Sequence, residues 1–230
     1  MSRSVFLLAA GFGSRLRPLT NHRPKPLLPI LGRPMLDYAV HNLQQIGHSP
    51  DAMLVNAHHL WEQVVAWAEA RGIAVQVELP EILGTGGGLR AAYDQLSDRF
   101  LIWNGDILAD IDCANVLAQC PEDGAAMVVR HDTNLGKTTE LCLDEGLVAR
   151  IGGLCATDDA PPLTSTNSGH HFTGIHAMSK AAVGLIPPGQ FACVVSTAYT
   201  SLVPQRKVNA YGTGAPINQN GEVSGPGWSS

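Results

Sequence analysis

Residues 5–17 read VFLLAAGFGSRLR, an apolar run that leads into two glycines and two arginines. The run Val5–Ala9 is continuous rather than alternating, which is typical of a central parallel strand covered on both faces. The glycines let the backbone approach an anion closely, while Arg15 and Arg17 can neutralise and fork onto phosphate. The stretch therefore predicts a buried first strand with a phosphate-binding loop at its carboxyl end.

This loop differs from two common phosphate-binding signatures. The P-loop pattern G-x-x-x-x-G-K-[ST] is absent, and Leu16 stands where a dinucleotide-binding G-x-G-x-x-G fingerprint carries its third glycine. An ordinary tight turn with surface arginines is the alternative interpretation of the loop taken alone.

Strand-like and helix-like patterns alternate through roughly the first 130 residues. Further strands are predicted at 52–55, 73–77, 100–103 and 125–129, and helices at 34–46, 60–70 and 87–96. This alternation predicts an α/β domain with a largely parallel sheet, whose ligands bind at the carboxyl ends of its strands. Three unusual segments follow strands and should meet at that edge: Gly11–Arg17, Gly84–Gly88 and Asn104–Asp106.

The second half of the chain changes character. Strand-like runs at 138–143 and 147–151 flank Asp144-Glu145-Gly146, which is a hairpin signature. Further along we expect a loop at 156–169, a strand at 171–176, a short helix at 179–186 and a last strand at 207–211. From Gly212 onward the composition predicts a loosely ordered tail. We therefore expect a single domain over residues 1–230, divided near residue 130.

Composition narrows the functional classes. The net charge is −5 over 230 residues and no basic run stands out, which argues against nucleic-acid binding. The five cysteines form no C-x-x-C pair, which favours a reducing cytoplasm over a disulfide framework or a zinc site. The N-terminal apolar run of about six residues is shorter than a signal-peptide core, and no segment approaches the ~20 apolar residues of a membrane span.

Two further segments carry charged side chains suited to a polyphosphate. Lys25 lies between two prolines, so that its cation is held on a stiff segment. Asp106 follows a predicted buried strand, where a carboxylate can hold Mg²⁺ against phosphate oxygens. A surface lysine and a turn-capping aspartate are the alternatives for each residue considered separately.

The run Gly84-Thr85-Gly86-Gly87-Gly88 opens a predicted helix. Consecutive glycines leave room for a flat ring against the backbone and expose amides to a base or sugar. A flexible turn capped by Thr85 is the alternative. Paired histidines at 58–59 and 170–171 lack metal-ligand spacing, and we interpret them as polar loop residues.

Taken together, these segments resemble the sugar-nucleotide pyrophosphorylase family of nucleotidyltransferases. Residues 9–29 are similar to its A-A-G-x-G-x-R-[LM]-x-P-L-T…K-P-[LM]-x-P signature, and the likeness continues through 84–88, 104–106 and Phe172-Thr173-Gly174-Ile175. It covers about residues 4–186. Among family members, the short length most resembles bacterial N-acetylmuramate-1-phosphate uridylyltransferases, with short heptose-1-phosphate and mannose-1-phosphate guanylyltransferases as close rivals.

The resemblance implies a fold and a reaction. The fold would be a Rossmann-like, three-layer α/β/α domain of the nucleotide-diphospho-sugar transferase type, with a mostly parallel mixed sheet. The reaction would join a nucleoside triphosphate, UTP being favoured, to a sugar 1-phosphate with Mg²⁺ and release pyrophosphate. Residues 1–130 would bind the nucleotide and residues 131–211 the sugar, with a cytoplasmic location and a role in cell-wall sugar-nucleotide synthesis.

The resemblance also implies roles for single residues. Arg15 would bind the leaving β,γ-phosphates, Lys25 would stabilise charge on the α-phosphate, and Asp106 would hold Mg²⁺. The sugar would contact Gly174, with Asn167 as a further candidate. The nucleotide would contact Ala9, Ala10, Gly11, Gly13, Glu78, Gly84, Gly86, Gly87 and Asn104.

One departure from the family pattern bears on the metal. The family carries W-x-D-x-G-T near its end, and that aspartate is its second metal ligand; here Trp228-Ser229-Ser230 stands in its place. We therefore assign no second metal ligand, and a non-catalytic nucleotide-sugar-binding protein is a second hypothesis. A Rossmann-type oxidoreductase is a third, disfavoured by the incomplete glycine pattern.

Overall fold

The computed structural model describes residues 2–131, 140–161, 169–213 and 215–216. Three sets of residues for which the sequence makes a prediction lie outside this part of the chain: 138–139 of the predicted strand, 162–168 of the predicted loop, which include Asn167, and 214 and 217–230 of the predicted tail. The helices are α1 (Met35–Gln45), α2 (Trp61–Glu69), α3 (Gly84–Ala91), α4 (Cys113–Ala118), α5 (Lys180–Val183) and α6 (Thr200–Leu202). The strands are β1 (Arg3–Leu8), β2 (Pro29–Ile30), β3 (Arg33–Pro34), β4 (Met53–Ala57), β5 (Ala74–Val77), β6 (Leu96–Asn104), β7 (Ala125–His131), β8 (Glu140–Asp144), β9 (Leu147–Ile151), β10 (Cys155–Ala156), β11 (His170–Ser179), β12 (Val208–Gly212) and β13 (Ala215–Pro216).

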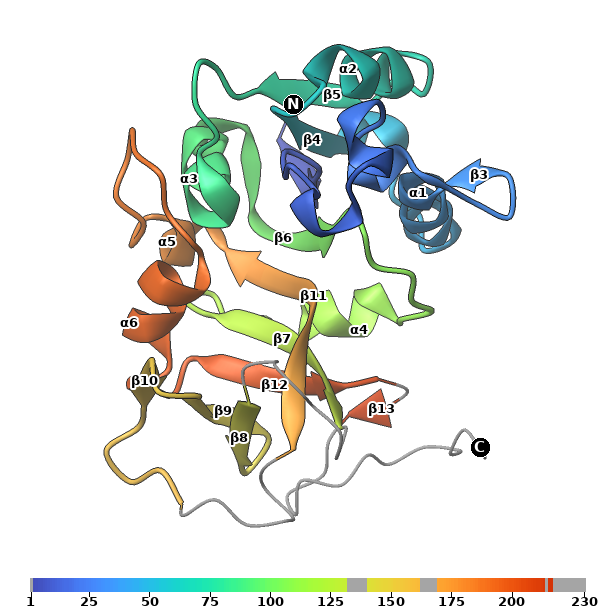
Figure 1. The fold of residues 1–230 in the computed structure, drawn as a ribbon. Helices are drawn as coiled ribbons and strands as arrows, with labels where there is room; N and C mark the ends of the chain where they lie inside the picture. The colour runs from blue at the N-terminus through green and yellow to red at the C-terminus, as the bar shows by residue number, and fades with distance from the viewer. Residues whose placement is uncertain (1, 132–139, 162–168, 214, 217–230) are drawn as a thin grey trace.

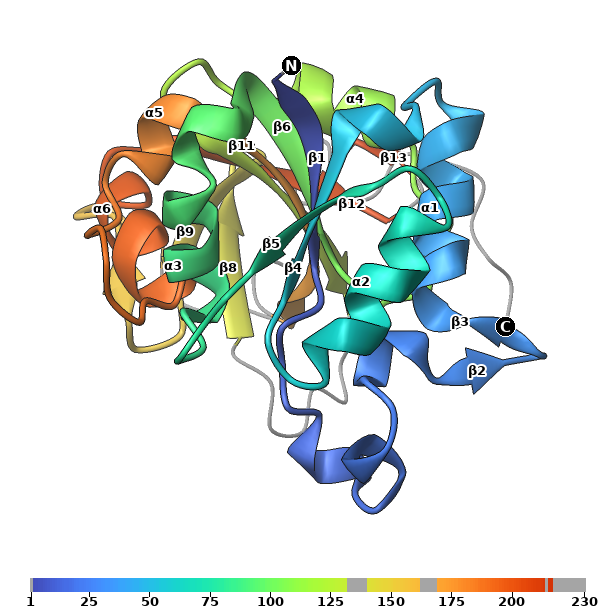
Figure 2. The same ribbon diagram turned by 90° about the horizontal axis from the view of Figure 1, so that it is seen from above.

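A twisted sheet forms the middle layer of the molecule, with helices on both faces. Figure 1 shows α1, α2 and α4 on one side of the sheet and α3, α5 and α6 on the other, and Figure 2 shows the same division from above. Each face has its own buried apolar cluster. Leu36, Val64 and Val116 belong to one cluster, and Leu89, Val183 and Leu202 to the other. The expected three-layer α/β/α arrangement is confirmed.

The sheet is mixed. Its first-half strands β1, β4, β5 and β6 pair in parallel, and its antiparallel pairs all involve strands from the second half. The path runs β10-β9-β12-β7-β11-β6-β1-β4-β5, with β8 paired to β9 and β11 and β13 paired to β12. β6, β1, β4 and β5 are parallel, as the alternating pattern predicts. β11 enters between β6 and β7 antiparallel to both, while β12 is parallel to β7. The parallel strands of the first half therefore end together at one edge.

Helix α1 shows how the apolar pattern produces the packing. Met35, Leu36, Ala39, Val40 and Leu43 are buried, at the three- and four-residue spacing of one helix face. Pro34 precedes the helix, and Gly47 turns the chain just after it at φ 92°. Burying this face against the sheet stabilises a helix that would be marginal alone.

Three elements differ from the sequence-based expectation. α3 begins at Gly84 rather than Gly87, because the carbonyl oxygen of Ala192 accepts from the amides of Gly86 and Gly87. α4 was not predicted; it is short, and Asp112 caps it by accepting from the Asn115 amide. A π-helical turn at Val195–Tyr199 leads into α6, where no local pattern indicated a helix. No helix among the described residues is long and apolar enough to cross a lipid bilayer.

Candidate nucleotide-binding site

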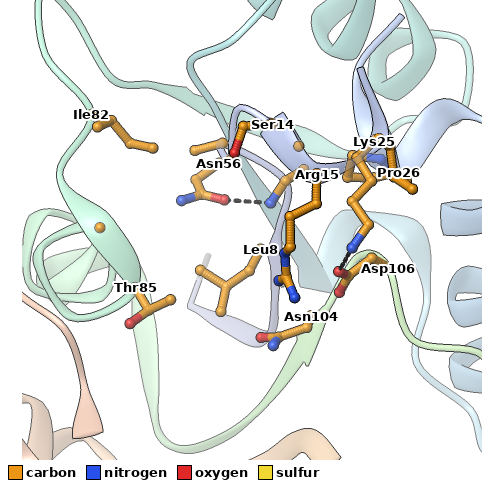
Figure 3. Close-up of a pocket in the computed structure, with 16 residues that line it drawn as sticks. Leu8, Ser14, Arg15, Lys25, Pro26, Asn56, Ile82, Thr85, Asn104 and Asp106 are labelled. Atoms are coloured by element: carbon orange, nitrogen blue, oxygen red, sulfur yellow. Dashed lines mark hydrogen bonds and ion pairs between the residues drawn. The ribbon is translucent and has the colours of Figure 1, made fainter. Parts of the chain in front are cut away.

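A pocket of about 280 Å³ opens at the carboxyl ends of the parallel strands. Its floor follows from the strand register, since Leu8 of β1 lies opposite Asn56 of β4 on one side and Asn104 of β6 on the other. The walls come from the loop after β1 and from the start of α3, which face each other across Leu8 (Figure 3). The lining residues are Leu8, Ala9, Ala10, Gly11, Gly13, Ser14, Arg15, Leu16, Lys25, Pro26, Asn56, Ile82, Gly84, Thr85, Asn104 and Asp106.

The loop after β1 is built around Gly13. This residue adopts φ 61°, and a Cβ there would approach Thr20 Cγ2 to 2.8 Å and Lys25 Cβ to 3.0 Å. The Thr20 hydroxyl donates to the Gly13 carbonyl at 3.0 Å, which ties the loop to the next turn. A 3-10 turn at Ser14–Leu16 follows, and Arg15 extends from it into the pocket (Figure 3).

Lys25 and Asp106 lie together on the same side of the pocket as Arg15 (Figure 3). Lys25 Nζ donates to Asp106 Oδ2, and the two side chains are 27% and 30% exposed. Gly105, the residue before Asp106, lets the chain pass close to Leu8 and Pro26. A Cβ at this position would lie 2.8 Å from the Leu8 carbonyl oxygen and 3.0 Å from Pro26 Cβ. The three charged residues selected from the sequence thus meet in one pocket, although they come from separate segments.

The donor set around Asp106 limits what metal this part of the chain can hold. Asp106 is the only carboxylate among the described residues that line the pocket. No group of three His, Cys, Asp or Glu side chains that could hold a metal occurs in the described ranges. Mg²⁺ binds one or two carboxylates together with phosphate oxygens and water, so a single aspartate fits an ion that arrives with a polyphosphate.

The glycine run at 84–88 is used differently from what we expected. Gly84 lines the pocket, but Gly86 and Gly87 do not. Their amides both donate to the Ala192 carbonyl oxygen, at 2.8 and 3.2 Å. A Cβ on Gly87 would lie 2.6 Å from the carbonyl oxygen of Gln190. The predicted contact of Gly86 and Gly87 with a base is therefore corrected: these glycines let residues 190–194 pack against α3.

Glu78 is also displaced from its expected role at the base. Its side chain is 2% exposed and is absent from the pocket lining. Oε1 accepts from Asn56 Nδ2 at 2.7 Å, and Oε2 accepts from the Leu83 amide at 2.8 Å. Burial raises the pKa of this carboxyl, while the hydrogen bonds from Leu83 and Asn56 oppose the rise. Glu78 supports the wall of the pocket from behind.

Asn56 is a pocket residue that sequence reasoning missed. Its Oδ1 accepts from the Ala9 amide at 2.7 Å, and the side chain is 1% exposed. One signal was available, since Asn56 is a polar residue within the apolar strand β4, whose five residues are all buried. A buried amide in such a strand needs partners, and here they are the loop after β1 and Glu78.

Gly174 lies behind Asn104 rather than in the pocket wall. The register between β11 and β7 shifts between Phe172 and His176, and Gly174 adopts φ 91° within this irregularity. A Cβ on Gly174 would lie 2.6 Å from Asn104 Nδ2. The structure thus places Gly174 beside a pocket residue, and its contact with a sugar stays a prediction.

The paired histidines at 58–59 hold the loop after β1. The ring of Phe12 packs against both, with centroid distances of 5.3 and 5.6 Å. His58 Nδ1 lies 2.8 Å from the Glu78 carbonyl oxygen, and His59 Nε2 lies 2.7 Å from the Thr20 carbonyl oxygen. The segment that follows β4 therefore holds the loop after β1 in place through ring packing and hydrogen bonds.

Comparison with known proteins identifies the family of this chain. Residues 5–171 match the family described as the MobA-like NTP transferase domain. The chain belongs to this family. As a MobA-like NTP transferase domain, it carries Arg15, Lys25 and Asp106 within the matched region, as well as both glycine-rich segments.

Curated relatives of this MobA-like domain include several uridylyltransferases. The UTP–glucose-1-phosphate uridylyltransferase of Synechocystis is 28% identical over 204 residues, which cover 81% of the chain and 51% of the relative. The N-acetylmuramate alpha-1-phosphate uridylyltransferase of Neisseria meningitidis is 37% identical over 117 residues, which cover 47% of the chain and 48% of the relative. The chain spans about half the length of these two relatives.

A solved structure shares the fold of the MobA-like domain. HddC from Yersinia pseudotuberculosis, in complex with GMP-PN, superposes with a TM-score of 0.70 at 19% identity. The superposition covers 93% of this chain and 91% of that chain. The likeness includes the second half of the sheet and confirms the nucleotide-diphospho-sugar transferase fold.

Proposed function

We propose that this protein transfers a nucleotidyl group from a nucleoside triphosphate to a sugar 1-phosphate and releases pyrophosphate. The observation that carries the proposal is the convergence of Arg15, Lys25 and Asp106 on one pocket at the carboxyl edge of the parallel strands. Membership of the MobA-like NTP transferase family and the activities in the names of its sugar-1-phosphate relatives support it.

The distribution of polar groups sets the direction of the nucleotide. The cations Arg15 and Lys25 lie on one side of the pocket, and Ile82 and Thr85 lie on the other (Figure 3). At the start of α3 the amides of Gly86 and Gly87 already donate to Ala192, so they offer no site for an anion. The triphosphate therefore lies toward Arg15 and Lys25, and the base lies toward Ile82 and Thr85.

The chemistry requires charge neutralisation and positioning. An oxygen of the sugar 1-phosphate attacks the α-phosphorus, and pyrophosphate leaves from the opposite side, so that two polyanions must approach each other. Lys25 binds the α-phosphate and Arg15 binds the leaving phosphates, which lowers the cost of this approach. Asp106 would hold Mg²⁺, which would supply further neutralisation. No protein nucleophile takes part.

Lys25 and Asp106 form an ion pair, in which Lys25 Nζ donates to Asp106 Oδ2. On binding of the substrates, Lys25 would turn to the α-phosphate and Asp106 to the metal. The ion pair holds both side chains at the pocket, which would reduce the entropy lost on binding.

For the substrates we favour UTP and, as the sugar, N-acetylmuramate 1-phosphate. Three uridylyltransferases among the relatives support this choice, and two of them act on that sugar by their names. A guanylyltransferase acting on mannose 1-phosphate or heptose 1-phosphate is the alternative. We place the reaction in the cytoplasm, in keeping with five free cysteines that all lie in the described part of the chain.

The test is a matrix of pyrophosphate-release assays. UTP, GTP, CTP and dTTP are each paired with N-acetylmuramate, glucose, mannose and heptose 1-phosphates, with Mg²⁺ or with EDTA. We expect Mg²⁺-dependent release that is fastest with UTP and N-acetylmuramate 1-phosphate. Fastest release with GTP would assign the alternative. Tight nucleotide binding without release from any pair would refute the transferase and favour the non-catalytic binding protein.

A further inference from the structure

A chain of three hydrogen bonds connects the two walls of the pocket. At one wall, the Ala9 amide donates to Asn56 Oδ1 at 2.7 Å. Asn56 Nδ2 then donates to Glu78 Oε1 at 2.7 Å. At the other wall, the Leu83 amide donates to Glu78 Oε2 at 2.8 Å. Ala9 begins the loop that carries Arg15, and Leu83 is the residue before α3.

The two ends of this chain determine its chemistry. Both ends are backbone N–H groups, which can only donate. Asn56 must therefore turn its oxygen to Ala9 and its nitrogen to Glu78, and Glu78 must accept with both oxygens. The ionised carboxylate, which accepts with both oxygens, fits these two donors. An amide at position 56 with a carboxylate at position 78 satisfies every group.

The surroundings leave room for this arrangement and for little else. A Cβ on Gly88 would lie 2.6 Å from Glu78 Oε1 and 3.0 Å from Asn56 Nδ2. The last glycine of the 84–88 run thus makes space for the hydrogen bond between the two side chains. Both side chains are almost fully buried, so water cannot readily replace a lost partner.

We propose that Asn56 and Glu78 form a positioning relay that sets the separation of the two pocket walls for nucleotidyl transfer. The relay holds Ala9 at the start of the phosphate-binding loop and Leu83 at the start of α3. Asn56 and Glu78 orient the two walls without contacting the reacting atoms. This inference rests on the proposed function. Asn56 and Glu78 are positioning residues, and Arg15 and Lys25 carry out the chemistry.

The polarity argument predicts a pattern that single substitutions and their combination must follow. In Glu78→Gln the new amide nitrogen faces another donor, and turning Asn56 over moves the conflict to Ala9. In Asn56→Asp two carboxylate oxygens face each other, and only an added proton relieves them. The double variant N56D/E78Q restores every hydrogen bond. Its carboxylate at position 56 accepts from Ala9 and from the amide nitrogen at position 78, and the amide oxygen at position 78 accepts from Leu83.

The experiment is a double-mutant cycle at pH 8, where proton sharing between carboxylates is disfavoured. Urea unfolding, affinity for Mg·UTP by calorimetry, and kcat and KM are measured for wild type, both single variants and N56D/E78Q. We expect each single variant to lose stability and to lower kcat on the order of 10- to 100-fold. The double variant should regain most of both losses, which gives a strong favourable coupling between the sites.

One readout separates positioning from simple support of the fold. The double variant moves the negative charge from position 78, outside the pocket lining, to position 56, which lines the pocket. Its kcat should recover while its KM for the triphosphate stays raised, and kcat is compared at a temperature where circular dichroism shows every variant folded. Glu81→Gln is the matched control, since it removes a carboxylate from the same loop at an exposed position and should leave the kinetics unchanged.

Several outcomes would overturn the relay. A double variant as defective as the sum of its single variants would exclude coupling, and normal kcat in folded single variants would exclude positioning. Single variants that cannot be purified folded still count for the relay if N56D/E78Q folds and turns over, and against it if the double variant also fails. Should wild type release no pyrophosphate from any pair, the proposed function falls, whereas stability and Mg·UTP affinity still decide the relay.

Discussion

The chain has two glycine-rich segments after parallel strands, and they serve opposite purposes. Around Gly11 the backbone is open, since a Cβ there would meet no atom within 4 Å. Around Gly87 the backbone is closed, since a Cβ would meet the Gln190 carbonyl oxygen at 2.6 Å. Gly11 leaves space for a ligand, whereas Gly87 leaves space for the protein's own chain.

A glycine therefore marks a close approach without identifying what approaches. In the first segment, charged side chains near the glycines indicate the partner, because the cations Arg15 and Lys25 favour an anionic ligand over an apolar one. In the second segment the partner is residues 190–194, about a hundred residues away in the sequence. No residue near Gly87 in the sequence predicts this contact. Four predictions test whether the two segments differ in this way.

The largest effect should come from removing a cation at the open segment. Lys25→Ala and Arg15→Ala should each lower turnover by a factor on the order of 10²–10³, the scale for losing one transition-state donor. Their free energy of unfolding should stay close to that of wild type, because both side chains face the pocket. Steady-state pyrophosphate release and urea unfolding check the two parts. Arg23→Ala, an exposed cation outside the pocket lining, is the control, and near-normal turnover in both pocket variants would contradict these roles.

Acid should weaken the packing of the turn at 195–199, which follows the residues that contact the closed segment. Residues 190–194 lead into the turn at 195–199, where the Tyr199 hydroxyl bonds to His176 Nδ1 at 2.5 Å. Burial lowers the pKa of His176 from 6.5 to about 3, so the unfolded chain binds a proton near pH 5 that the native state does not. Stability is then complete above pH 6.5 and falls as the pH drops toward 3, by about 2 kcal/mol between pH 7 and pH 5 from this group.

Urea unfolding at several pH values measures this loss. Burial also lowers the pKa of His170, to about 4, with the same sign. His176→Gln keeps an acceptor for Tyr199 and removes the titration, so its stability should decline less steeply between pH 7 and pH 5. An unchanged slope in that variant would show that His176 is not the source.

Filling the closed segment should destabilise the protein. Gly87→Ala places a methyl group 2.6 Å from the Gln190 carbonyl oxygen, so residues 190–194 or α3 must move. We expect a loss of about 1–2 kcal/mol, because a packing cost of about 1–3 kcal/mol exceeds the gain in helix propensity. Thermal unfolding measures it. Gly153→Ala, where a Cβ would meet nothing within 4 Å, is the control; equal stability of both variants would show that the segment is not closed.

The smallest effect on stability should come from Gly11→Ala. A methyl group at this position meets open space, and the free energy of unfolding should change by less than about 0.5 kcal/mol. Because Gly11 lines the pocket, the KM for the triphosphate should rise. Calorimetric binding beside thermal unfolding separates the two effects. A large stability loss with normal binding would reverse the assignment of the two segments.

Much of the first half of the molecule could be predicted from local patterns. Continuous apolar runs indicated β1, β4 and β6, because the parts of a strand that are covered on both faces carry mostly apolar side chains. The three-four spacing indicated α1 and α2, and the edge rule for parallel sheets predicted the meeting of the segments that carry Arg15 and Asp106. The antiparallel entry of β11 between β6 and β7 could not be obtained in this way, because pairing partners depend on contacts far apart in sequence.

The candidate site divides in the same manner. Its charged residues were accessible to sequence reasoning, because the segments that carry Lys25 and Asp106 together resemble a known family. Its supporting residues were not, because the roles of Asn56 and Glu78 exist only when Ala9 and Leu83 lie at the two ends of their hydrogen-bond chain. The assignment of residues 131–211 to the sugar, including Gly174, stays a prediction.

Local sequence was enough to establish which segments are buried, which carry cations and carboxylate, and at which edge of the sheet they meet. These properties follow from periodicity and side-chain chemistry, which act over a few residues. Packing in three dimensions settled which glycines face open space, which face residues 190–194 and which buried polar groups find partners. Such properties depend on atoms that the fold brings within a few ångströms, and sequence spacing carries no measure of that distance.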